Sequence, residues 1–359
     1  MQSFTAKSWL FALVLAAAAL FAPQRGYSDD RFGHHRPVDR IVVFGDSLSD
    51  PGNLYQLCRA GLVPPSPQPN DPDPCNVEAP GYGMVGLDAL VGIPSLPYSV
   101  GANHLSNGPT WIEQFAKVAG LGWSVRPAML GSVAGSSNYA VAGARASDFS
   151  QSPNVPLSQQ VDAFLLRDGG PRNNPDAALV VMQLGGNDIR DVLLEGSSAP
   201  IANAIASIRD NIIRLHYAGA RRFLVWNVPN LGATPAFRAL DSLTPPQPGV
   251  PTPSQLATGA SIAFNQALHL VLTGLEAALS DIVIVQFNAF QSLQKVQAHP
   301  RLYGLRDAEH ACISAISQPS QCASPDRNLF WDGIHPTRAG HAIIALLAGK
   351  ALLREVLDD

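Results

Sequence analysis

Arg40-Ile-Val-Val-Phe44 is a short, continuous apolar run that ends in the turn Gly45-Asp46-Ser47-Leu48. An uninterrupted apolar run closed by a glycine-containing turn is typical of a strand buried on both faces of a parallel sheet. The stretch therefore predicts a central parallel strand whose carboxyl end carries a small, polar turn.

Further along the chain, strand-like apolar runs alternate with segments of helical periodicity. The other strand candidates are 138–142, 177–184, 222–228 and 281–287, and the helix candidates are 111–119, 156–166, 202–218, 261–279 and 338–357. Such alternation indicates a parallel sheet covered by helices on both faces. We therefore predict an α/β fold, a three-layer α/β/α sandwich with a central, mostly parallel five-stranded sheet. Functional residues of such sheets lie beyond the carboxyl ends of the strands.

The composition excludes several classes of protein. Of 359 residues, 46% are hydrophobic and 14% are charged, with 30 glycines and 30 prolines. The charged fraction of an average soluble domain is about 25%, so the chain reads as a globular protein with long loops and not as a disordered one. The net charge of -4 provides no basic field for a phosphate backbone. We therefore expect no nucleic-acid partner.

The N-terminal residues predict export. Lys7 precedes an uncharged apolar run over 9–22, which is shorter than the roughly 20 residues that a spanning helix requires. Small residues at Ala22, Gly26 and Ser28 offer cleavage sites. We predict a signal peptide over 1–28, cleaved at about 22–28, and hence a secreted or periplasmic protein with no integral membrane segment after cleavage. An uncleaved N-terminal anchor is the alternative.

The rest of the chain predicts one domain over 40–359, after a polar lead over 29–39. Loop insertions are expected near 56–110 and 236–253, where proline and glycine are frequent and periodicity is weak. In an oxidising compartment the four cysteines are expected to form disulfides, and their three possible connectivities include the local pairs Cys58–Cys75 and Cys312–Cys322. No cysteine or histidine spacing predicts a metal site.

Ser47 and the later block Asp332-Gly-Ile-His335-Pro are candidates for nucleophilic chemistry. A serine needs a base, and a carboxylate three residues before a histidine can accept its Nδ1–H, which leaves Nε2 to take the serine proton. Taken alone, each block could equally cap a helix. Asp307 and His310 share the same spacing, but the Pro-Thr helix start follows His335.

Two glycine-containing blocks could supply donors for a developing oxyanion. Gly185-Gly186-Asn187-Asp188 follows the apolar run 177–184, and Asn138-Tyr-Ala-Val-Ala-Gly143-Ala144 contains a glycine whose N–H no side chain obstructs. The Asn187 amide and the Gly143 N–H are the candidate donors. Taken alone, each block could be an ordinary turn at the end of a strand.

Together the four blocks resemble the GDSL esterases of the SGNH hydrolase superfamily. They stand in the family's order, and the resemblance extends from about Ile41 to Leu347. The segments Asp50-Pro-Gly-Asn53 and 227–235 also resemble those of family members, whereas Ala142 replaces a glycine that is common in the family. The chain has no Gly-x-Ser-x-Gly elbow, which disfavours an ordinary α/β-hydrolase.

The resemblance implies a serine triad and an oxyanion hole. Ser47 is the implied nucleophile, His335 the base and Asp332 its orienting carboxylate. The implied oxyanion donors are the Ser47 N–H, the Gly143 N–H and the Asn187 side chain.

The implied function is a secreted serine ester hydrolase that forms an acyl-enzyme and requires no cofactor or metal. Lipid esters or short- and medium-chain acyl esters are the expected substrates. The alternatives are a carbohydrate acetylesterase acting on acetylated polysaccharide, an acyltransferase with the same site, or a catalytically inactive secreted binding protein. The two insertions are expected to line the substrate pocket, with Tyr82, Tyr98, Trp111 and Phe237 as candidates.

Overall fold

The structure is a computed structural model that describes residues 37–62, 104–131, 134–148, 155–167, 175–244, 247–314 and 320–358. The predicted signal peptide, most of the polar lead and most of the first insertion, with Cys75, Tyr82 and Tyr98, lie outside these residues. Of the described helices, none is long and apolar enough to span a membrane.

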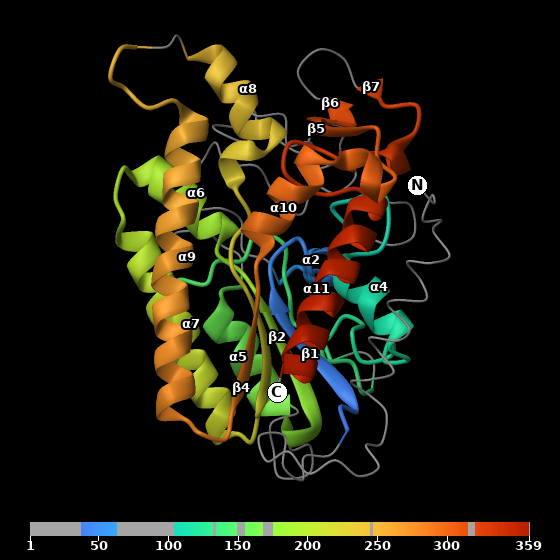
Figure 1. Cartoon of the computed structure of the whole chain (residues 1–359). Helices are drawn as coiled ribbons and strands as arrows, with labels where there is room; N and C mark the ends of the chain where they lie inside the picture. The colour runs from blue at the N-terminus through green and yellow to red at the C-terminus, as the bar shows by residue number, and fades with distance from the viewer. Residues whose placement is uncertain are drawn as a thin grey trace.

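A parallel sheet of four strands forms the centre of the molecule (Figure 1). Its strands, in their order across the sheet, are β1 (Arg40–Gly45), β2 (Ala178–Gln183), β3 (Arg222–Trp226) and β4 (Val283–Phe287). The register aligns Gly45 of β1 with Gln183 of β2, so the turns that follow these two strands lie side by side. This arrangement brings the Ser47 turn next to the Gly-Gly-Asn-Asp block.

The fifth predicted strand, over 138–142, lies along β1 but is not a regular strand. Tyr139 N–H donates to the Val43 carbonyl at 2.8 Å, and Val141 N–H donates to the Gly45 carbonyl at 3.1 Å. The described sheet therefore has four strands where we expected five. When this edge segment is counted, the chain order across the sheet is 2-1-3-4-5, the flavodoxin-like order, which places β1 and β2 at the switch point where ligands bind.

Side chains explain why this edge is irregular. The carbonyls of Asn138 and Ala140 each accept a hydrogen bond from Asn53 Nδ2 at 2.8 Å, and Asn138 Oδ1 accepts from the Ala140 N–H at 3.0 Å. These carbonyls point away from β1, so the bonds hold the outer edge of the segment. The ladder with β1 is interrupted because the Gly45 N–H donates to Gln160 Oε1 at 2.9 Å and not to the Tyr139 carbonyl.

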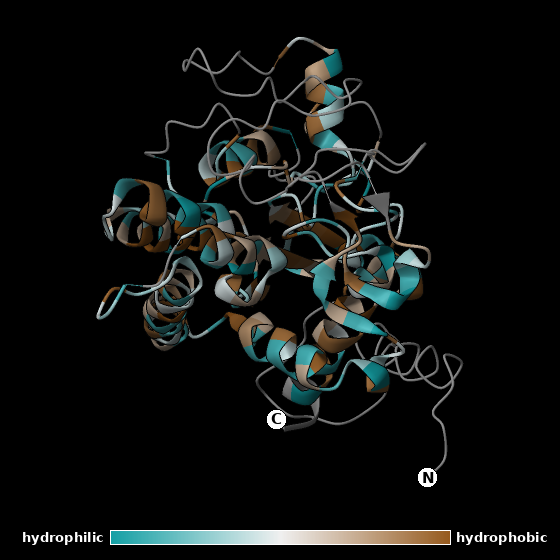
Figure 2. Ribbon diagram, turned by 90° about the horizontal axis from the view of Figure 1, so that it is seen from above, coloured by the Kyte–Doolittle hydropathy of each residue, from teal (hydrophilic) through white to brown (hydrophobic). Residues whose placement is uncertain are grey.

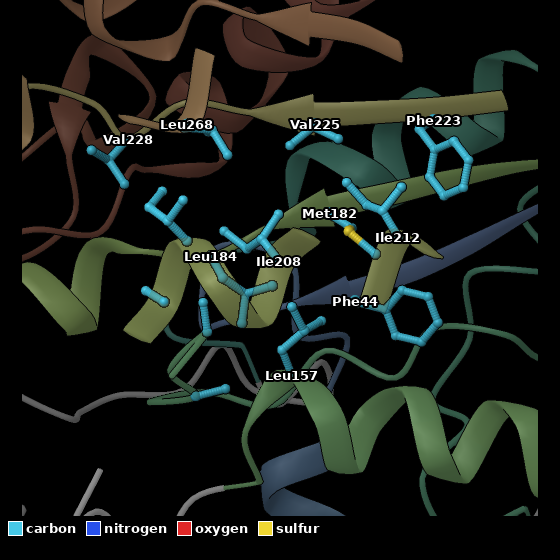
Figure 3. Packing of buried hydrophobic residues seen from close by; sticks show 14 of the residues in the cluster. Phe44, Leu157, Met182, Leu184, Ile208, Ile212, Phe223, Val225, Val228 and Leu268 are labelled. Atoms are coloured by element: carbon cyan, nitrogen blue, oxygen red, sulfur yellow. The ribbon is translucent and has the colours of Figure 1, made fainter. Parts of the chain in front are cut away.

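Helices cover both faces of the sheet, which confirms the three-layer sandwich. One face packs on α5 (Leu157–Arg167), α6 (Gly186–Glu195), α7 (Ala199–Tyr217) and α9 (Pro253–Ala278); the other packs on α4 (Trp111–Val118) and α11 (Arg338–Asp358). Phe44, Met182 and Phe223 pack against helix residues such as Leu157 and Ile212 (Figure 3). From above, the strands of the central sheet are brown between helices that carry teal on their outer faces (Figure 2), as expected of strands buried on both faces.

Shorter elements complete the fold, mostly at the end of the sheet where the strands terminate (Figure 1). They are α2 (Asn53–Arg59), α8 (Pro235–Leu243), α10 (Ala289–Ala298), the pair β5 (Asp307–Ala311) and β8 (Asn328–Phe330), the pair β6 (Ile313–Ser314) and β7 (Ser320–Gln321), and the 3-10 turns η2 (Pro175–Ala177), η3 (Leu231–Ala233), η4 (Pro300–Tyr303) and η5 (Pro325–Arg327). Part of the second predicted insertion is thus helix α8. The Cys312–Cys322 disulfide is confirmed, with 4.8 Å between the two Cα atoms. The pairing of Cys58 with Cys75 stays a prediction.

Candidate active site

The turn after β1 is held by close packing around Gly45. A Cβ at this position would lie 3.0 Å from Ser49 Cβ, 3.1 Å from the Gln183 carbonyl oxygen and 3.2 Å from Ala140 Cβ. The Gln160 side chain accepts from the Gly45 N–H and donates to the Gly45 carbonyl, both at 2.9 Å. Glycine is therefore needed here because β2 and the edge segment approach so closely, and the start of the Ser47 turn is fixed on both backbone groups.

The two residues that flank Ser47 are anchored through one glutamine of β2. Gln183 Nε2 donates to Asp46 Oδ1 at 2.9 Å, and Gln183 Oε1 accepts from the Ser49 hydroxyl at 2.8 Å. Burial raises the pKa of Asp46 to about 6, although hydrogen bonds from the Leu48 N–H and Gln183 oppose that rise. Ser47 itself stays half-buried between these two anchored neighbours.

The side chains of Ser47, His335 and Asp332 are joined by two successive hydrogen bonds. His335 Nε2 lies 2.8 Å from Ser47 Oγ, and His335 Nδ1 lies 2.6 Å from Asp332 Oδ2. The other oxygen of Asp332 accepts from the N–H groups of Ile334 at 2.8 Å and His335 at 2.7 Å. With Nδ1 protonated and bound to the buried carboxylate, Nε2 is the acceptor for the serine proton.

The second Asp-His pair has the same local geometry in a different place. His310 Nδ1 lies 2.9 Å from Asp307 Oδ2, but the His310 side chain is 78% exposed, whereas that of His335 is 5% exposed. Asp307 Oδ1 accepts from the N–H groups two and three residues on, as Asp332 Oδ1 does. The described structure places no serine hydroxyl within hydrogen-bond distance of His310.

The three expected oxyanion donors lie around the same corner of the sheet. Asn187, at the start of α6, lines the same cavity as Ser47 and donates one amide hydrogen to the Ala144 carbonyl at 2.9 Å, next to Gly143. Gly143 has a φ of 79°, which favours glycine. Neither the Ser47 N–H nor the Gly143 N–H donates a hydrogen bond to another described residue.

Two buried carboxylates hold the Gly143 turn in place. Asp50 accepts from the Gly52 N–H at 2.7 Å and from the Ala142 N–H at 2.8 Å, which joins the start of α2 to the residue before Gly143. Asp188 accepts hydrogen bonds from the N–H groups of Ala146 and Ser147, each at 2.9 Å. Burial raises the pKa of both carboxyls, that of Asp188 to about 6.

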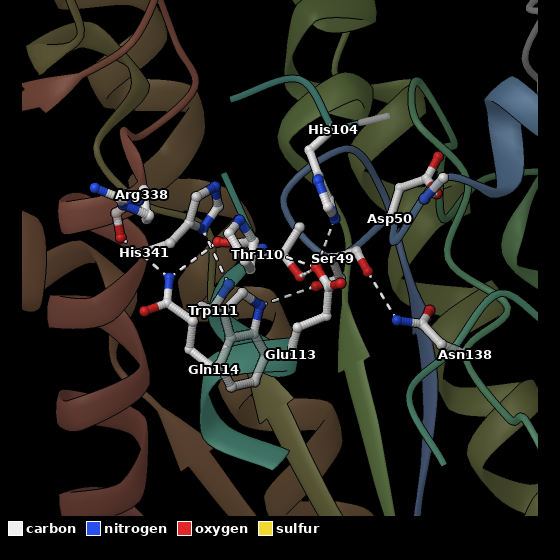
Figure 4. Close-up of polar contacts among 12 residues, drawn as sticks. Ser49, Asp50, His104, Thr110, Trp111, Glu113, Gln114, Asn138, Arg338 and His341 are labelled. Atoms are coloured by element: carbon white, nitrogen blue, oxygen red, sulfur yellow. Dashed lines mark hydrogen bonds and ion pairs between the residues drawn. The ribbon is translucent and has the colours of Figure 1, made fainter. Parts of the chain in front are cut away.

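A buried polar network continues from the serine turn to the last helix (Figure 4). Trp111 Nε1 donates to Ser49 Oγ at 2.9 Å, and the Trp111 N–H donates to His341 Nδ1 at 3.2 Å. Burial, together with the neighbouring His104 and His335, lowers the pKa of His341 to about 3. His341 therefore acts as a neutral acceptor that links α4 to α11.

Sequence reasoning missed the supporting residues Gln160, Gln183 and His341. Each had a signal in the pattern: Gln183 is a polar residue inside the apolar run 177–184, and Gln160 lies on the apolar face of its helix with Val161 and Phe164. A buried polar side chain must find a hydrogen-bond partner, so a polar residue at a core position indicates a structural or functional contact. His341 is a polar residue among the alanines, isoleucines and leucines of the helix candidate 338–357.

A cavity of about 110 Å³ opens beside Ser47 and His335. Polar residues of the triad turn and Asn187 lie at one part of it, and most of the other lining side chains are apolar. These apolar residues come from β3, β4, α8, α10, β8 and α11: Trp226, Phe237, Phe287, Ala289, Leu293, Val296, Leu329, Phe330, Ile343, Ile344 and Leu347. Of the liners expected from sequence, Phe237 is present, while Trp111 packs in the core between the sheet and α11.

Within the described ranges, no group of three or more His, Cys, Asp or Glu side chains is placed to hold a metal ion. A serine hydroxyl, an imidazole and a carboxylate lie in hydrogen-bond contact at the carboxyl edge of the open parallel sheet. A hydrogen-bonded Ser-His-Asp series at this edge of an α/β sheet is the arrangement that serine hydrolases use.

The chain belongs to the GDSL-like lipase/acylhydrolase family, whose model matches residues 41–348. A GDSL esterase/lipase of Arabidopsis thaliana is 26% identical over 344 residues, covering 84% of this chain and 83% of the relative. A second one, GDSL esterase/lipase 5 of the same plant, is 24% identical over 93% of this chain and 88% of the relative. A phosphatidylcholine-sterol acyltransferase of Aeromonas hydrophila is 25% identical over 86% of this chain and 89% of the relative. Membership of this family makes the protein an ester hydrolase or acyltransferase.

Proposed function

We propose that this protein is an exported enzyme that hydrolyses lipid or simple carboxylic esters through an acyl-enzyme on Ser47. The observation that carries the proposal is the unbroken sequence of contacts from Ser47 Oγ to His335 Nε2 at 2.8 Å and from His335 Nδ1 to Asp332 Oδ2 at 2.6 Å. Export, with a signal peptide over 1–28 ahead of one domain over 40–359, remains part of the proposal and rests on the sequence pattern.

The chemistry follows from this geometry. His335 Nε2 removes the Ser47 proton while the serine oxygen bonds to the ester carbonyl carbon, and the carbonyl oxygen becomes an oxyanion. The Ser47 N–H, the Gly143 N–H and the Asn187 amide are the proposed donors to that oxyanion. His335 then returns the proton to the leaving alcohol as its bond to the acyl carbon breaks. Water repeats both steps on the acyl-enzyme and releases the acid.

The test compares Ser47→Ala with the wild type on p-nitrophenyl butanoate. We expect kcat to fall by about 10⁶, because removal of a triad nucleophile leaves only the residual catalysis of binding and the oxyanion donors. A fluorophosphonate should also label the peptide that contains Ser47 in the wild type. Wild-type turnover in the variant, or labelling at another serine, rejects the assignment.

The chain offers a matched control for the base. His335→Ala and His310→Ala remove the same side chain from two Asp-His pairs with the same local geometry. We expect His335→Ala to lose activity nearly as completely as Ser47→Ala, and exposed His310→Ala to retain it. Equal losses in both variants contradict the choice of His335.

Acyl transfer is the second candidate function, and it is favoured by the similarity to a protein named as a phosphatidylcholine-sterol acyltransferase. Any acyl-enzyme can react with an alcohol in place of water. Product analysis with an added long-chain alcohol separates the two: a new ester in proportion to the alcohol supports transfer, and free acid alone supports hydrolysis.

A further inference from the structure

The cavity beside Ser47 leads into the interior between the carboxyl ends of β3 and β4 and the helices α10 and α11. Its apolar walls include Trp226 from β3, Phe287 from β4, Val296 from α10 and Phe330 from β8. All four side chains are at most 4% exposed. This part of the cavity, which we call the inner chamber, therefore has an apolar wall shielded from solvent.

The two helices that border the inner chamber contribute small or aliphatic side chains. Ala289, Ser292 and Leu293 line it from α10, and Ile343 and Leu347 line it from α11. Because dense packing is the rule in protein interiors, a void between two helices next to a reactive serine needs an occupant. An apolar wall favours an apolar occupant, since water gains few hydrogen bonds there.

We propose that the inner chamber binds the acyl chain of the substrate, so that the preferred substrates are esters of medium-chain fatty acids. This inference rests on the proposed acyl-enzyme function and specifies its substrate. The acyl group stays bonded to Ser47 while the alcohol leaves and water enters. A chamber enclosed by core residues suits the group that stays, whereas the alcohol must have access to solvent.

The volume of the cavity sets the length of chain. One water molecule needs roughly 10–15 Å³ of such a volume, and a methylene group is about the size of a water molecule. The cavity of about 110 Å³, which includes the part beside the triad, therefore has room for several methylene groups, on the order of a medium-length acyl chain. An acetyl group would leave most of the chamber empty, which disfavours an acetylated polysaccharide as the substrate.

Burial of each methylene group should raise kcat/KM by up to about fourfold, from the transfer free energy of a methylene group. Octanoate has six more methylene groups than acetate, and about half of this limiting gain per group already gives a rise of about 100-fold. We therefore expect kcat/KM of the wild type on p-nitrophenyl esters to rise by at least about 100-fold from acetate to octanoate and then to level off or fall for longer chains. A parallel series of alkyl acetates, in which the alcohol is lengthened, should show a much smaller rise.

The matched variants are Ser292→Phe and Gln291→Phe. Both introduce the same ring at adjacent positions of α10, but Ser292 lines the chamber and Gln291 is exposed. Ser292→Phe should lower the octanoate-to-acetate ratio of kcat/KM by at least tenfold, and Gln291→Phe should leave this ratio unchanged. Leu347→Ala, which removes three carbons from the opposite wall, should shift the optimum toward longer acyl chains and provides a second test if Ser292→Phe does not fold.

The outcomes separate this inference from the function on which it rests. A flat acyl-length profile, a rise that follows the alcohol instead, or a ratio that Ser292→Phe and Leu347→Ala both leave unchanged overturns the acyl chamber, while a Ser47-dependent esterase still stands. A wild type that is inert on every ester, or as active as Ser47→Ala, rejects the proposed function and the chamber together.

Discussion

Gly185→Ala is the substitution that most directly tests how the fold positions the Asn187 amide. Gly185 is the residue before α6 and has a φ of 117°, a conformation that side chains rarely adopt. A Cβ there would lie 2.5 Å from Phe264 Cζ and 2.7 Å from Val228 Cγ1. Both neighbours are buried in the core that covers this face of the sheet, so they have little room to move.

Two costs add at this position. The unfavourable φ costs about 1–3 kcal/mol, and forcing a methyl group into a packed core costs about 1–3 kcal/mol more. We therefore expect Gly185→Ala to lower the free energy of unfolding by about 2–6 kcal/mol. Because Asn187 follows within the same turn, a displacement of that turn should also reduce kcat, by about 10²-fold for a shift of 1 Å.

Gly186→Ala is the matched control for stability. Its φ is not in the left-handed range, and a Cβ there would meet no described atom within 4 Å. Urea unfolding followed by intrinsic fluorescence should place Gly186→Ala within about 1 kcal/mol of the wild type. Equal free energies of unfolding for the two alanine variants would refute the reasoning, because they would show that neither the φ nor the contact with Phe264 matters.

Two further predictions concern the groups around the triad. Burial lowers the pKa of His341 to about 3, so below about pH 6.5 the unfolded chain binds a proton that the folded protein does not. As the pH falls from 6.5 toward 3, the free energy of unfolding of the wild type should therefore fall by about 1.4 kcal/mol per pH unit relative to that of His341→Asn. The introduced amide oxygen of this control variant can still accept from the Trp111 N–H. A difference in stability between the two proteins that is the same at pH 7 and pH 4.5 contradicts this prediction. Asp332→Asn should lower kcat by about 10⁴ with a small change in KM, because the amide no longer selects the Nδ1–H tautomer of His335, and a loss below tenfold in steady-state kinetics would remove Asp332 from the triad.

The strands and helices were largely predictable, because buried parallel strands and amphipathic helices leave a strong periodic pattern. The edge segment 138–142 was not, since its apolar character matches that of a strand. Its ladder with β1 is interrupted where the Gly45 N–H donates to Gln160, a residue from a distant part of the sequence, and no local pattern records that contact. The inner chamber was missed for a similar reason: its walls come from α10, α11 and the strand ends, while sequence reasoning looked to the insertions.

The supporting polar residues were only partly predictable from the sequence. Gln160 and Gln183 stand at apolar positions of their segments, and that anomaly was visible in the sequence. Their partners, Gly45 and the residues on either side of Ser47, are more than a hundred positions away along the chain. A sequence can show that a buried polar group needs a partner, but the partner itself depends on how the segments pack.

The two Asp-His pairs show what the local sequence determines and what only the tertiary structure determines. The sequence alone determines the local turn, because a carboxylate can accept the N–H groups two and three residues on and then meet the imidazole three residues away; Asp307–His310 and Asp332–His335 both do so. Which imidazole meets Ser47 is decided by the tertiary structure. The parallel sheet brings the end of β1 to the turn before α11, 288 residues apart in sequence, and buries one pair beside the serine while the other stays in solvent. The proposed chemistry at this site therefore depends on long-range packing, because local spacing creates the Asp-His pair and only the fold brings a serine hydroxyl to it.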